Sequence, residues 1–247
     1  MATKKVIPIQ PLTAWSFSRY TAYKECPAKL KYSAIDKISE PSNTAMQRGN
    51  AIHQMAENYI KGTLKVLPPE LKLFKDELAK LKKMFKADPG SMIVEQQWAF
   101  SKAWGDSSWF DMATCWARIK MDCGHHEDDT TLIVTDWKTG KFREHEVIIY
   151  TEQLELYALS AMLLHPHIET VRPRLVYLDQ DLVWDGPPNK PLVFTRTDIP
   201  ALKKAWEKRV KPMLADTIFA PRPNSKCKWC FYGQSGKVKG GPGLCKY

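Results

Sequence analysis

The sequence of 247 residues lacks any long hydrophobic run. Its longest mostly apolar stretch, residues 156–164, is far shorter than the roughly 20 residues that span a membrane. The first residues, MATKKVIPIQPLT, also lack an apolar segment of signal-peptide length. We therefore expect no membrane partner and a cytoplasmic location, which would be the host cytoplasm for a viral protein.

Acidic residues are scarce relative to basic ones. Asp and Glu number 27 against 37 Lys and Arg, which gives a formal net charge of +10 and a pI of about 9.2. This excess favours a polyanionic partner, with nucleic acid ahead of an anionic membrane surface. Internal repeats and low-complexity tracts are missing too, and the hydrophobic content of 44% suffices for one large buried core.

Hydrophobic periodicity predicts a chain that begins with helices and continues with strands. The predicted helices cover residues 16–31, 44–60, 71–85, 149–164 and 199–214, the first being interrupted at Cys26-Pro27. The predicted strands cover residues 92–100, 109–122, 131–137, 172–178 and 192–195, and we expect the first three to be antiparallel. A solvated acidic loop at 124–130, with His125 and His126, is expected between the second and third strands.

This order of elements predicts an α/β fold with a central mixed β-sheet flanked by helices. We expect a single domain over residues 1–247. An N-terminal helical elaboration would cover about 14–88, the catalytic core about 91–216, and a Cys-containing C-terminal tail about 217–247.

The stretch VTDWKTGK at residues 134–141 raises the question of function. Strand residues alternate between faces, so Asp136 and Lys138 follow the apolar Val134 on one face. On the preceding predicted strand, Asp122 shares its face with Lys120 and Arg118. If the two strands pair, both acids converge near one edge of the sheet.

Two carboxylates and a lysine can support metal-assisted hydrolysis of a phosphodiester. Carboxylate oxygens suit Mg²⁺ or Mn²⁺, and the metal polarises the phosphate and activates a bound water. The lysine can orient that water and offset developing negative charge. A pair of salt bridges at strand ends is the structural alternative, and a lone D-x-K pattern would favour it.

The pattern is accompanied by three others in a fixed order. Gly49 precedes His53 by four residues on a predicted helix, and Gln153 precedes Tyr157 by four residues on a later one. With Asp122 and the DWK sequence between them, the chain resembles the PD-(D/E)XK nuclease superfamily, and within it the RecB-like exonuclease branch. The resemblance covers nearly the whole chain and implies a restriction-endonuclease-like core.

The resemblance also implies a role for each matched residue. Asp122 and Asp136 would bind the metal together with the carbonyl of Trp137, and Lys138 would serve the nucleophilic water. His53 would complete the metal shell, and its nitrogen makes Mn²⁺ a plausible activator beside Mg²⁺.

Residues around this predicted centre would bind the DNA. Gln153 and Tyr157 would position the strand near the metal, and Arg118 or Lys120 would contact a phosphate. Glu95, on the strand before, is expected in the outer shell of the metal site.

Six cysteines in a reducing compartment favour metal binding over disulfides. Cys227 and Cys230 form a C-x-x-C pair, and Cys245 follows after a glycine-rich insert. RecB-like nucleases of the iron–sulfur type, including CRISPR-associated ones, use one N-terminal cysteine and three C-terminal ones. Cys26, Cys227, Cys230 and Cys245 would then hold a 4Fe-4S cluster, with Zn²⁺ as the alternative. The other two, Cys115 and Cys123, read as core residues.

The sequence therefore predicts a divalent-metal-dependent DNA nuclease, an exonuclease acting in DNA recombination, repair or replication, of phage or bacterial type. Two alternatives stay open: a structure-specific endonuclease or nickase, and a non-catalytic DNA-binding module on the same fold. Strand polarity, single- or double-stranded substrate, and the oligomeric state are left undecided by the sequence.

Overall fold

The computed structural model describes residues 12–234 and 240–247. Their contacts divide into two compact units. One unit, called the sheet unit here, is Ser42–Trp206. The other, called the cysteine unit, joins the described residues before Ser42 to those after Trp206. Helix α6 (Ile199–Ala215) contributes residues to both units. The single domain expected from the sequence remains a prediction.

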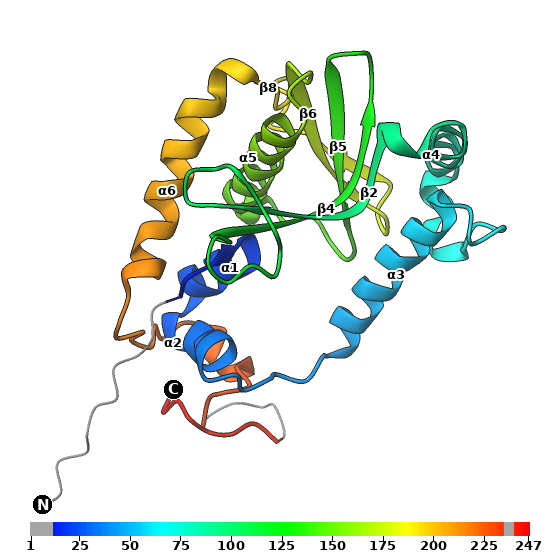
Figure 1. Ribbon diagram of the computed structural model, residues 1–247. Helices are drawn as coiled ribbons and strands as arrows, with labels where there is room; N and C mark the ends of the chain where they lie inside the picture. The colour runs from blue at the N-terminus through cyan, green and yellow to red at the C-terminus, as the bar shows by residue number, and fades with distance from the viewer. Residues whose placement is uncertain (1–11, 235–239) are drawn as a thin grey trace, which may run out of the picture. The chain divides into compact units, whose positions relative to one another are not determined.

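The sheet unit begins with helices and continues with a mixed β-sheet (Figure 1). Its helices are α3 (Thr44–Ile60), α4 (Lys75–Ala87) and α5 (Val147–Leu164), and a 3-10 turn, Pro69–Phe74, leads into α4. Its strands are β2 (Met92–Phe100), β3 (Asp106–Ser107), β4 (Ala117–His126), β5 (Thr131–Lys138), β6 (Thr170–Tyr177), β7 (Leu182–Trp184) and β8 (Phe194–Thr195). The spatial order is β3-β2-β4-β5-β6-β7, and β8 pairs with β6.

The strands β2, β4 and β5 are antiparallel neighbours, as the sequence predicts, whereas β5 and β6 run parallel. Parallel strands need a crossover connection, and α5 supplies it between β5 and β6. The result is the predicted α/β fold with a mixed sheet flanked by helices.

Helices cover both faces of this sheet, with α5 on one side and α4 on the other (Figure 1). A hydrophobic core joins α3 and α4 to β2, β4, β5 and β6, and Trp137 lies at 2% exposure within it. Because successive strand residues alternate faces, Asp136 and Lys138 point away from this core, toward α5. The alternation at the end of β5 therefore separates the core from the charged groups.

Helix α5 is long and apolar enough, with the turn before it, to cross a membrane by length and composition alone. Ten of its residues are buried within the protein, among them Leu154, Leu156 and Leu159. The core helix of a soluble protein passes the same test, and the burial of α5 against the sheet accounts for its hydrophobicity.

The cysteine unit is built from short elements. It contains β1 (Trp15–Ser16), α1 (Phe17–Glu25), α2 (Pro27–Leu30), a π-helical turn (Lys31–Ile35) and a 3-10 turn (Cys227–Trp229). Ser16 caps α1 by accepting a hydrogen bond from the Arg19 amide, and the break at Cys26-Pro27 falls where the sequence predicts it.

The structure corrects the predicted strand over residues 109–122. Only its second half is a strand, because β4 begins at Ala117. The segment before it is a loop in which the Asp111 carboxylate accepts hydrogen bonds from the Ala113 and Thr114 amides, a local turn that competes with strand pairing.

β4 also runs further than predicted, to His126, so the connection to β5 is shorter than expected. His125 is therefore a buried strand residue, not a solvated loop residue, and burial lowers its pKa to about 4. The strand β7 was not predicted, because three residues are too few to show a period.

Candidate active site

Three carboxylates stand in a row across β2, β4 and β5. Val94 pairs with Cys123, and Cys123 pairs with Thr135. One position further along each strand, this register places Asp122 between Glu95 and Asp136. All three carboxylates are at least nine-tenths buried as side chains. The register of the sheet thus collects negative charge from three strands at one place.

His53 joins this row from helix α3. Its Nδ1 atom lies 3.4 Å from Asp122 Oδ2 and 3.7 Å from Glu95 Oε1. Burial would lower the pKa of His53, but the contacts with these two carboxylates outweigh it and raise the pKa to about 10. In the absence of a metal ion the imidazolium of His53 therefore balances part of the acidic charge.

Neighbouring charges act in opposite directions on the two acids beside His53. Burial and the charge of Asp136 raise the pKa of Asp122 above its ordinary value. Burial also acts to raise the pKa of Glu95, but His53 and Lys120 hold it below the ordinary value, and Lys120 Nζ lies 2.6 Å from Glu95 Oε2. The cationic side chains thus neutralise Glu95 more fully than Asp122, whose charge is also opposed by that of Asp136.

Asp136 is held by a network from α5. Its Oδ1 atom accepts hydrogen bonds from the Tyr157 hydroxyl at 2.8 Å and from Gln153 Nε2 at 3.0 Å. Gln153 also accepts a hydrogen bond from Lys138 Nζ at 2.9 Å, and Lys138 Nζ lies 2.6 Å from Asp136 Oδ2. The side chains of Gln153 and Tyr157 thus fix the carboxylate and the lysine together.

Gln153 and Tyr157, which the sequence predicts to position the DNA strand, both bond Asp136 in the structure. Tyr157 is buried at 6% exposure, and burial together with the charge of Asp136 raises the pKa of its hydroxyl well above 10. The hydroxyl therefore stays protonated and donates to Asp136. A DNA contact by either residue remains a prediction, while their grip on Asp136 is a direct feature of the structure.

The donor set fits a divalent metal ion. Within the part of the chain that the structure describes, His53, Glu95 and Asp122 form the one group of three or more potential ligands close enough to share an ion. Glu95 Oε1 and Asp136 Oδ2 are buried, and each faces one cationic side chain, His53 Nδ1 at 3.7 Å and Lys138 Nζ at 2.6 Å. Each carboxylate keeps further lone pairs that a divalent ion can share. Carboxylate oxygens with one imidazole suit Mn²⁺ or Mg²⁺.

Glu95, for which the sequence predicts a place in the outer shell of the metal site, belongs to the same group of potential ligands as His53 and Asp122. Its backbone lies at φ of 51°, in the left-handed region, although it is inside strand β2 and is not a glycine. Such a conformation costs on the order of 1–3 kcal/mol and concentrates at functional sites. Neither the strand register nor this backbone strain can be inferred from the sequence. The sequence therefore provides only weak evidence that Glu95 belongs to the site.

Trp137 contributes to the site through its backbone. Its amide donates a hydrogen bond of 3.0 Å to Asp122 Oδ2, while its side chain lies in the hydrophobic core. The bond orients the carboxylate of Asp122 from the neighbouring strand. The role of the Trp137 carbonyl as a metal ligand remains a prediction.

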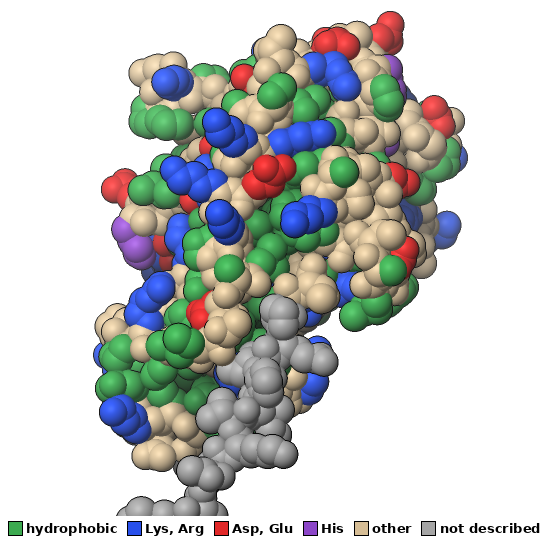
Figure 2. Space-filling model, turned by 60° about the vertical axis from the view of Figure 1, so that its left-hand side comes forward, with side chains coloured by type: hydrophobic (Ala, Val, Ile, Leu, Met, Phe, Trp, Pro, Cys, Tyr) green, Lys and Arg blue, Asp and Glu red, His purple; other side chains and the backbone are tan. Residues whose placement is uncertain are grey.

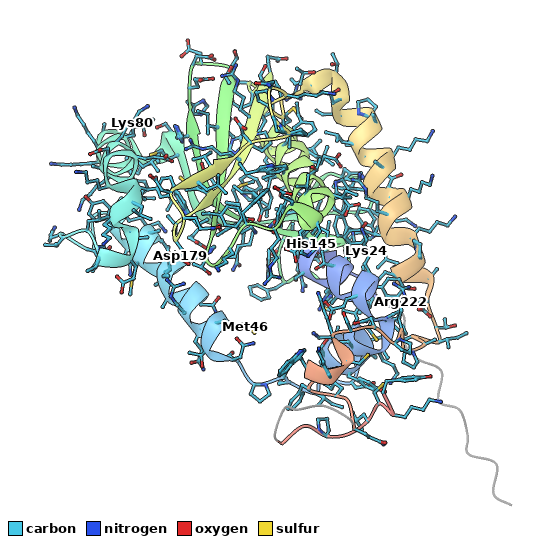
Figure 3. The ribbon with its side chains drawn as sticks, turned by 180° about the vertical axis from the view of Figure 1, so that it is seen from behind. Lys24, Met46, Lys80, His145, Asp179 and Arg222 are labelled. Carbon is cyan, nitrogen blue, oxygen red and sulfur yellow. The ribbon has the colours of Figure 1, made fainter. Side chains whose placement is uncertain are left out.

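A polar clamp holds the turn that follows Lys138, and sequence reasoning missed it. Arg48 of α3 donates two hydrogen bonds, of 2.6 and 2.9 Å, to the carboxylate of Asp179, which in turn accepts one of 2.6 Å from the Gly140 amide. Gly140 needs its φ of 88°, which glycine adopts without strain. Figure 3 shows Asp179 at the turn that follows β6. The clamp ties α3, which carries His53, to the end of β5.

The two basic residues predicted to bind phosphate lie on the same strand as Asp122. Lys120 is half-exposed and paired with Glu95, and Arg118 lies over the Trp109 ring, 5.6 Å from its centroid. Both share the face of Asp122 because they are two and four residues before it. Further Lys and Arg side chains appear on the face that Figure 2 brings forward.

The four cysteines predicted to bind one metal centre all belong to the cysteine unit, and all are free and partly exposed. Cys26 Sγ accepts a hydrogen bond of 3.4 Å from the Arg222 amide, and Cys227 Sγ accepts one of 3.3 Å from the Asn224 amide. Figure 3 labels Arg222 in this part of the chain. The tail segment 222–227 is thus attached to the end of α1.

The other two predicted cluster ligands, Cys230 and Cys245, lie near Tyr32. The Tyr32 and Tyr232 rings lie 5.2 Å apart, and the Cys245 amide donates to the Tyr232 carbonyl at 2.9 Å. Burial raises the pKa of Tyr32, and its neighbours Cys245, Asp36, Cys26 and Cys230 act in the same direction. The two remaining cysteines, Cys115 and Cys123, are buried in the sheet unit, as expected for core residues.

The sequence also matches a model of a known protein family. A family model for the PD-(D/E)XK nuclease superfamily matches residues 14–122 and 118–235. No curated protein matches the chain significantly. Among solved structures, SSO0001 aligns over 91% of this chain and 86% of its own at 16% identity, with a TM-score of 0.43. A "Putative exonuclease" from Eubacterium rectale aligns over 88% and 86% at 9% identity, with a TM-score of 0.47.

Proposed function

The chain belongs to the PD-(D/E)XK nuclease superfamily, and from the geometry of its acidic site we propose that it hydrolyses DNA phosphodiester bonds with the help of a divalent metal ion. One observation carries the proposal: Glu95, Asp122 and Asp136 lie in one row, with His53 at one end and Lys138 at the other. A purely structural salt-bridge cluster would explain the ion pairs of His53, Lys120 and Lys138, but it gives no reason for the left-handed φ of 51° at Glu95, a kind of strain that concentrates at functional sites.

Each residue has a defined task in this reaction. Asp122, Asp136 and His53, with Glu95, would hold Mg²⁺ or Mn²⁺, which supplies a polarised phosphate oxygen and an acidified water when bound. Lys138 would orient the attacking water and stabilise the charge that develops on the phosphate. Tyr157 and Gln153 keep Asp136 and Lys138 in position, as second-sphere groups do around many metal sites.

The finer activity that we propose is that of an exonuclease in DNA recombination, repair or replication. Its support is the set of motifs shared with the RecB-like branch: Gly49 before His53, the DWK sequence, and Gln153 before Tyr157. The net charge of +10 agrees with a polyanionic substrate. A structure-specific endonuclease or nickase and a non-catalytic DNA-binding module are the competing functions.

One assay separates these three functions. Purified protein is incubated with end-labelled linear DNA and with covalently closed circular DNA, each with and without Mg²⁺ or Mn²⁺. An exonuclease degrades only the linear DNA, and an endonuclease or nickase also cuts the circle. Absence of metal-dependent cleavage of both substrates would overturn the proposed function and leave the DNA-binding module.

We also propose that Cys26, Cys227, Cys230 and Cys245 hold a metal centre in the cysteine unit. The donors fit such a group, because four free thiols gather there and two of them accept hydrogen bonds from backbone amides. One N-terminal and three C-terminal cysteines are the ligand set of the iron–sulfur type of RecB-like nuclease, which favours a 4Fe-4S cluster over Zn²⁺.

A further inference from the structure

The loop between β3 and β4 displays apolar side chains to solvent. Phe110 is 81% exposed and Met112 is 74% exposed, although they are only two residues apart. Single exposed apolar residues are common, but paired ones on one loop form a surface that water solvates poorly. We call residues 108–114 the apolar loop.

This exposure is not a sign of a loosely ordered loop. The Asp111 carboxylate accepts hydrogen bonds of 2.8 Å from the Ala113 amide and 2.5 Å from the Thr114 hydroxyl, and Thr114 also lies 2.8 Å from the Ser107 hydroxyl. The Cys115 amide donates to the Asp111 carbonyl at 2.9 Å. The loop is therefore held in one conformation, which presents Phe110 and Met112 outward.

Three aromatic side chains from the segments around the apolar loop are buried. Phe100, Trp104 and Trp116 pack together, with ring centroids 6.0 Å and 5.2 Å apart, and all three are buried. The chain can thus bury aromatic rings at this place, and Phe110 stays outside because of the loop conformation.

The apolar loop is followed on β4 by two basic side chains, Arg118 and Lys120, which we call the basic lane. This lane ends at Asp122 of the predicted metal site. Trp109 of the loop lies under the Arg118 guanidinium, 5.6 Å from ring centroid to Cζ. Arg118, Lys120 and Asp122 then follow at every second position of β4, on one face. At about 3.3 Å per residue, the lane from Arg118 to Asp122 is about 13 Å long.

We propose that the apolar loop is a stacking platform for the bases of single-stranded DNA, whose backbone follows Arg118 and Lys120 to the metal site. Aromatic rings beside a basic track are the usual means of binding single strands, because every unpaired base offers a flat face. A duplex hides those faces within its stack, so the platform discriminates against it. The inference rests on the proposed nuclease function and adds the form of substrate that the site accepts.

Binding in metal-free buffer with EDTA tests the platform apart from cleavage. Fluorescence anisotropy is measured with labelled oligothymidylate and with a labelled blunt-ended duplex, which has no unpaired bases. Phe110→Ala should weaken oligothymidylate binding about 5- to 100-fold, the usual range for loss of one stacked base. Its effect on the duplex should be about twofold or less, because the backbone contacts of Arg118 and Lys120 remain.

Matched variants separate stacking from general apolar contact. Phe110→Trp should bind oligothymidylate like the wild type, and Phe110→Leu should bind it like Phe110→Ala. Val66→Ala, which removes another highly exposed apolar side chain of the sheet unit, should change neither affinity. Unchanged melting temperatures for all variants would show that the fold is kept.

Several results would overturn the platform. Equal losses on both DNA forms, no loss on either, or full binding by Phe110→Leu would each rule out base stacking, and the last would indicate an apolar docking face for another protein. The proposed nuclease function is judged separately. Metal-dependent cleavage by the wild type with no effect of Phe110→Ala would remove the platform alone, whereas Phe110-dependent single-strand binding without any cleavage would remove the nuclease function alone.

Discussion

The acidic site and the cysteine cluster are held in different ways. In the sheet unit, the acids lie on neighbouring strands whose register brings them together, and their surroundings are almost fully buried. In the cysteine unit, Cys227 belongs to a 3-10 turn, and Cys230 and Cys245 lie outside regular helices and strands. Their neighbourhood is mostly exposed, apart from residues such as Phe231 and Tyr232.

This difference shows what each region needs from a metal. The sheet holds the acids in place at a cost, because mutual repulsion and burial raise the pKa of Asp122. A divalent ion there would relieve the electrostatic strain of a site that is already formed. The tail has little apolar surface to hold itself, so a metal centre there would supply much of its folding energy.

The largest expected effect comes from removing an acid of the preformed site. Asp136→Ala should reduce metal-dependent DNA cleavage by about 10³-fold or more, because metal stabilisation of the transition state is worth several kcal/mol. The fold should survive with a melting temperature lowered by several °C, because Lys138 and the Tyr157 hydroxyl lose their buried partner. Asp128→Ala, a change at an exposed loop carboxylate, is the control for activity. A cleaving Asp136→Ala protein would contradict the assignment of the site.

The second effect tests whether the tail depends on its metal centre. Cys26→Ala should lose the bound metal and lower stability by several °C, whereas Cys115→Ala should keep the metal because Cys115 belongs to the sheet unit. Metal analysis of anaerobically purified protein, with thermal unfolding, provides the measurement. Iron is the expected element. Zinc in its place would contradict the cluster type, and full metal retention in Cys26→Ala would contradict the shared centre.

A smaller effect is expected from the residues that orient Asp136. Tyr157→Phe removes one hydroxyl that bonds Asp136 Oδ1, and it should weaken metal affinity about 10- to 100-fold, as loss of a second-sphere partner does. Tyr150→Phe removes a hydroxyl of the same helix that bonds Glu146, and it serves as the matched control. Calorimetric titration with Mn²⁺ measures both. If Tyr157→Phe leaves Mn²⁺ affinity unchanged and weakens only DNA binding, the predicted DNA-positioning role replaces the orienting one.

The smallest expected effect is the contribution of His53 to the pH dependence of folding stability. The pKa of His53 is about 10 in the metal-free folded protein against 6.5 ordinarily, so its ion pairs stabilise the fold fully below pH 6.5. This contribution should decline as pH rises from 6.5 toward 10, because the folded protein then loses the proton. Urea unfolding of metal-free protein at several pH values should show the decline in wild type and in His145→Gln, an exposed control, but much less in His53→Gln. Equal pH slopes for the three proteins would show that His53 has no such charge partners.

The sequence predicts the elements that carry the site with good accuracy. Helix α3 and strand β2 have the bounds expected from periodicity, because Asn43 caps α3 and Pro89 and Gly90 precede β2. The strand that ends in Asp136 and Lys138, and the helix that presents Gln153 and Tyr157, were also recognisable. Long elements with one clear period are the easiest to infer.

The remaining features depend on contacts between distant segments. The place of Glu95 beside Asp122 follows from strand register, which no local pattern encodes. The bond from Tyr157 to Asp136 joins residues 21 positions apart, and the clamp from Arg48 to Asp179 joins residues 131 positions apart. The apolar loop alternates like a strand, but Asp111 bonds its own neighbours and ends the pairing.

Trp137 lies between Asp136 and Lys138 in the sequence and faces the core that Ile52, next to His53, also joins. A replacement such as Trp137→Leu would leave a void in that core and let α3 and β5 shift toward each other. In a directed-evolution experiment for thermostability, tolerated substitutions would therefore be distributed unevenly over this protein. Changes in the central core would be screened out as loss of activity, and the tolerant positions would lie on outer surfaces such as the lysine-rich face of α4, where Figure 3 labels Lys80.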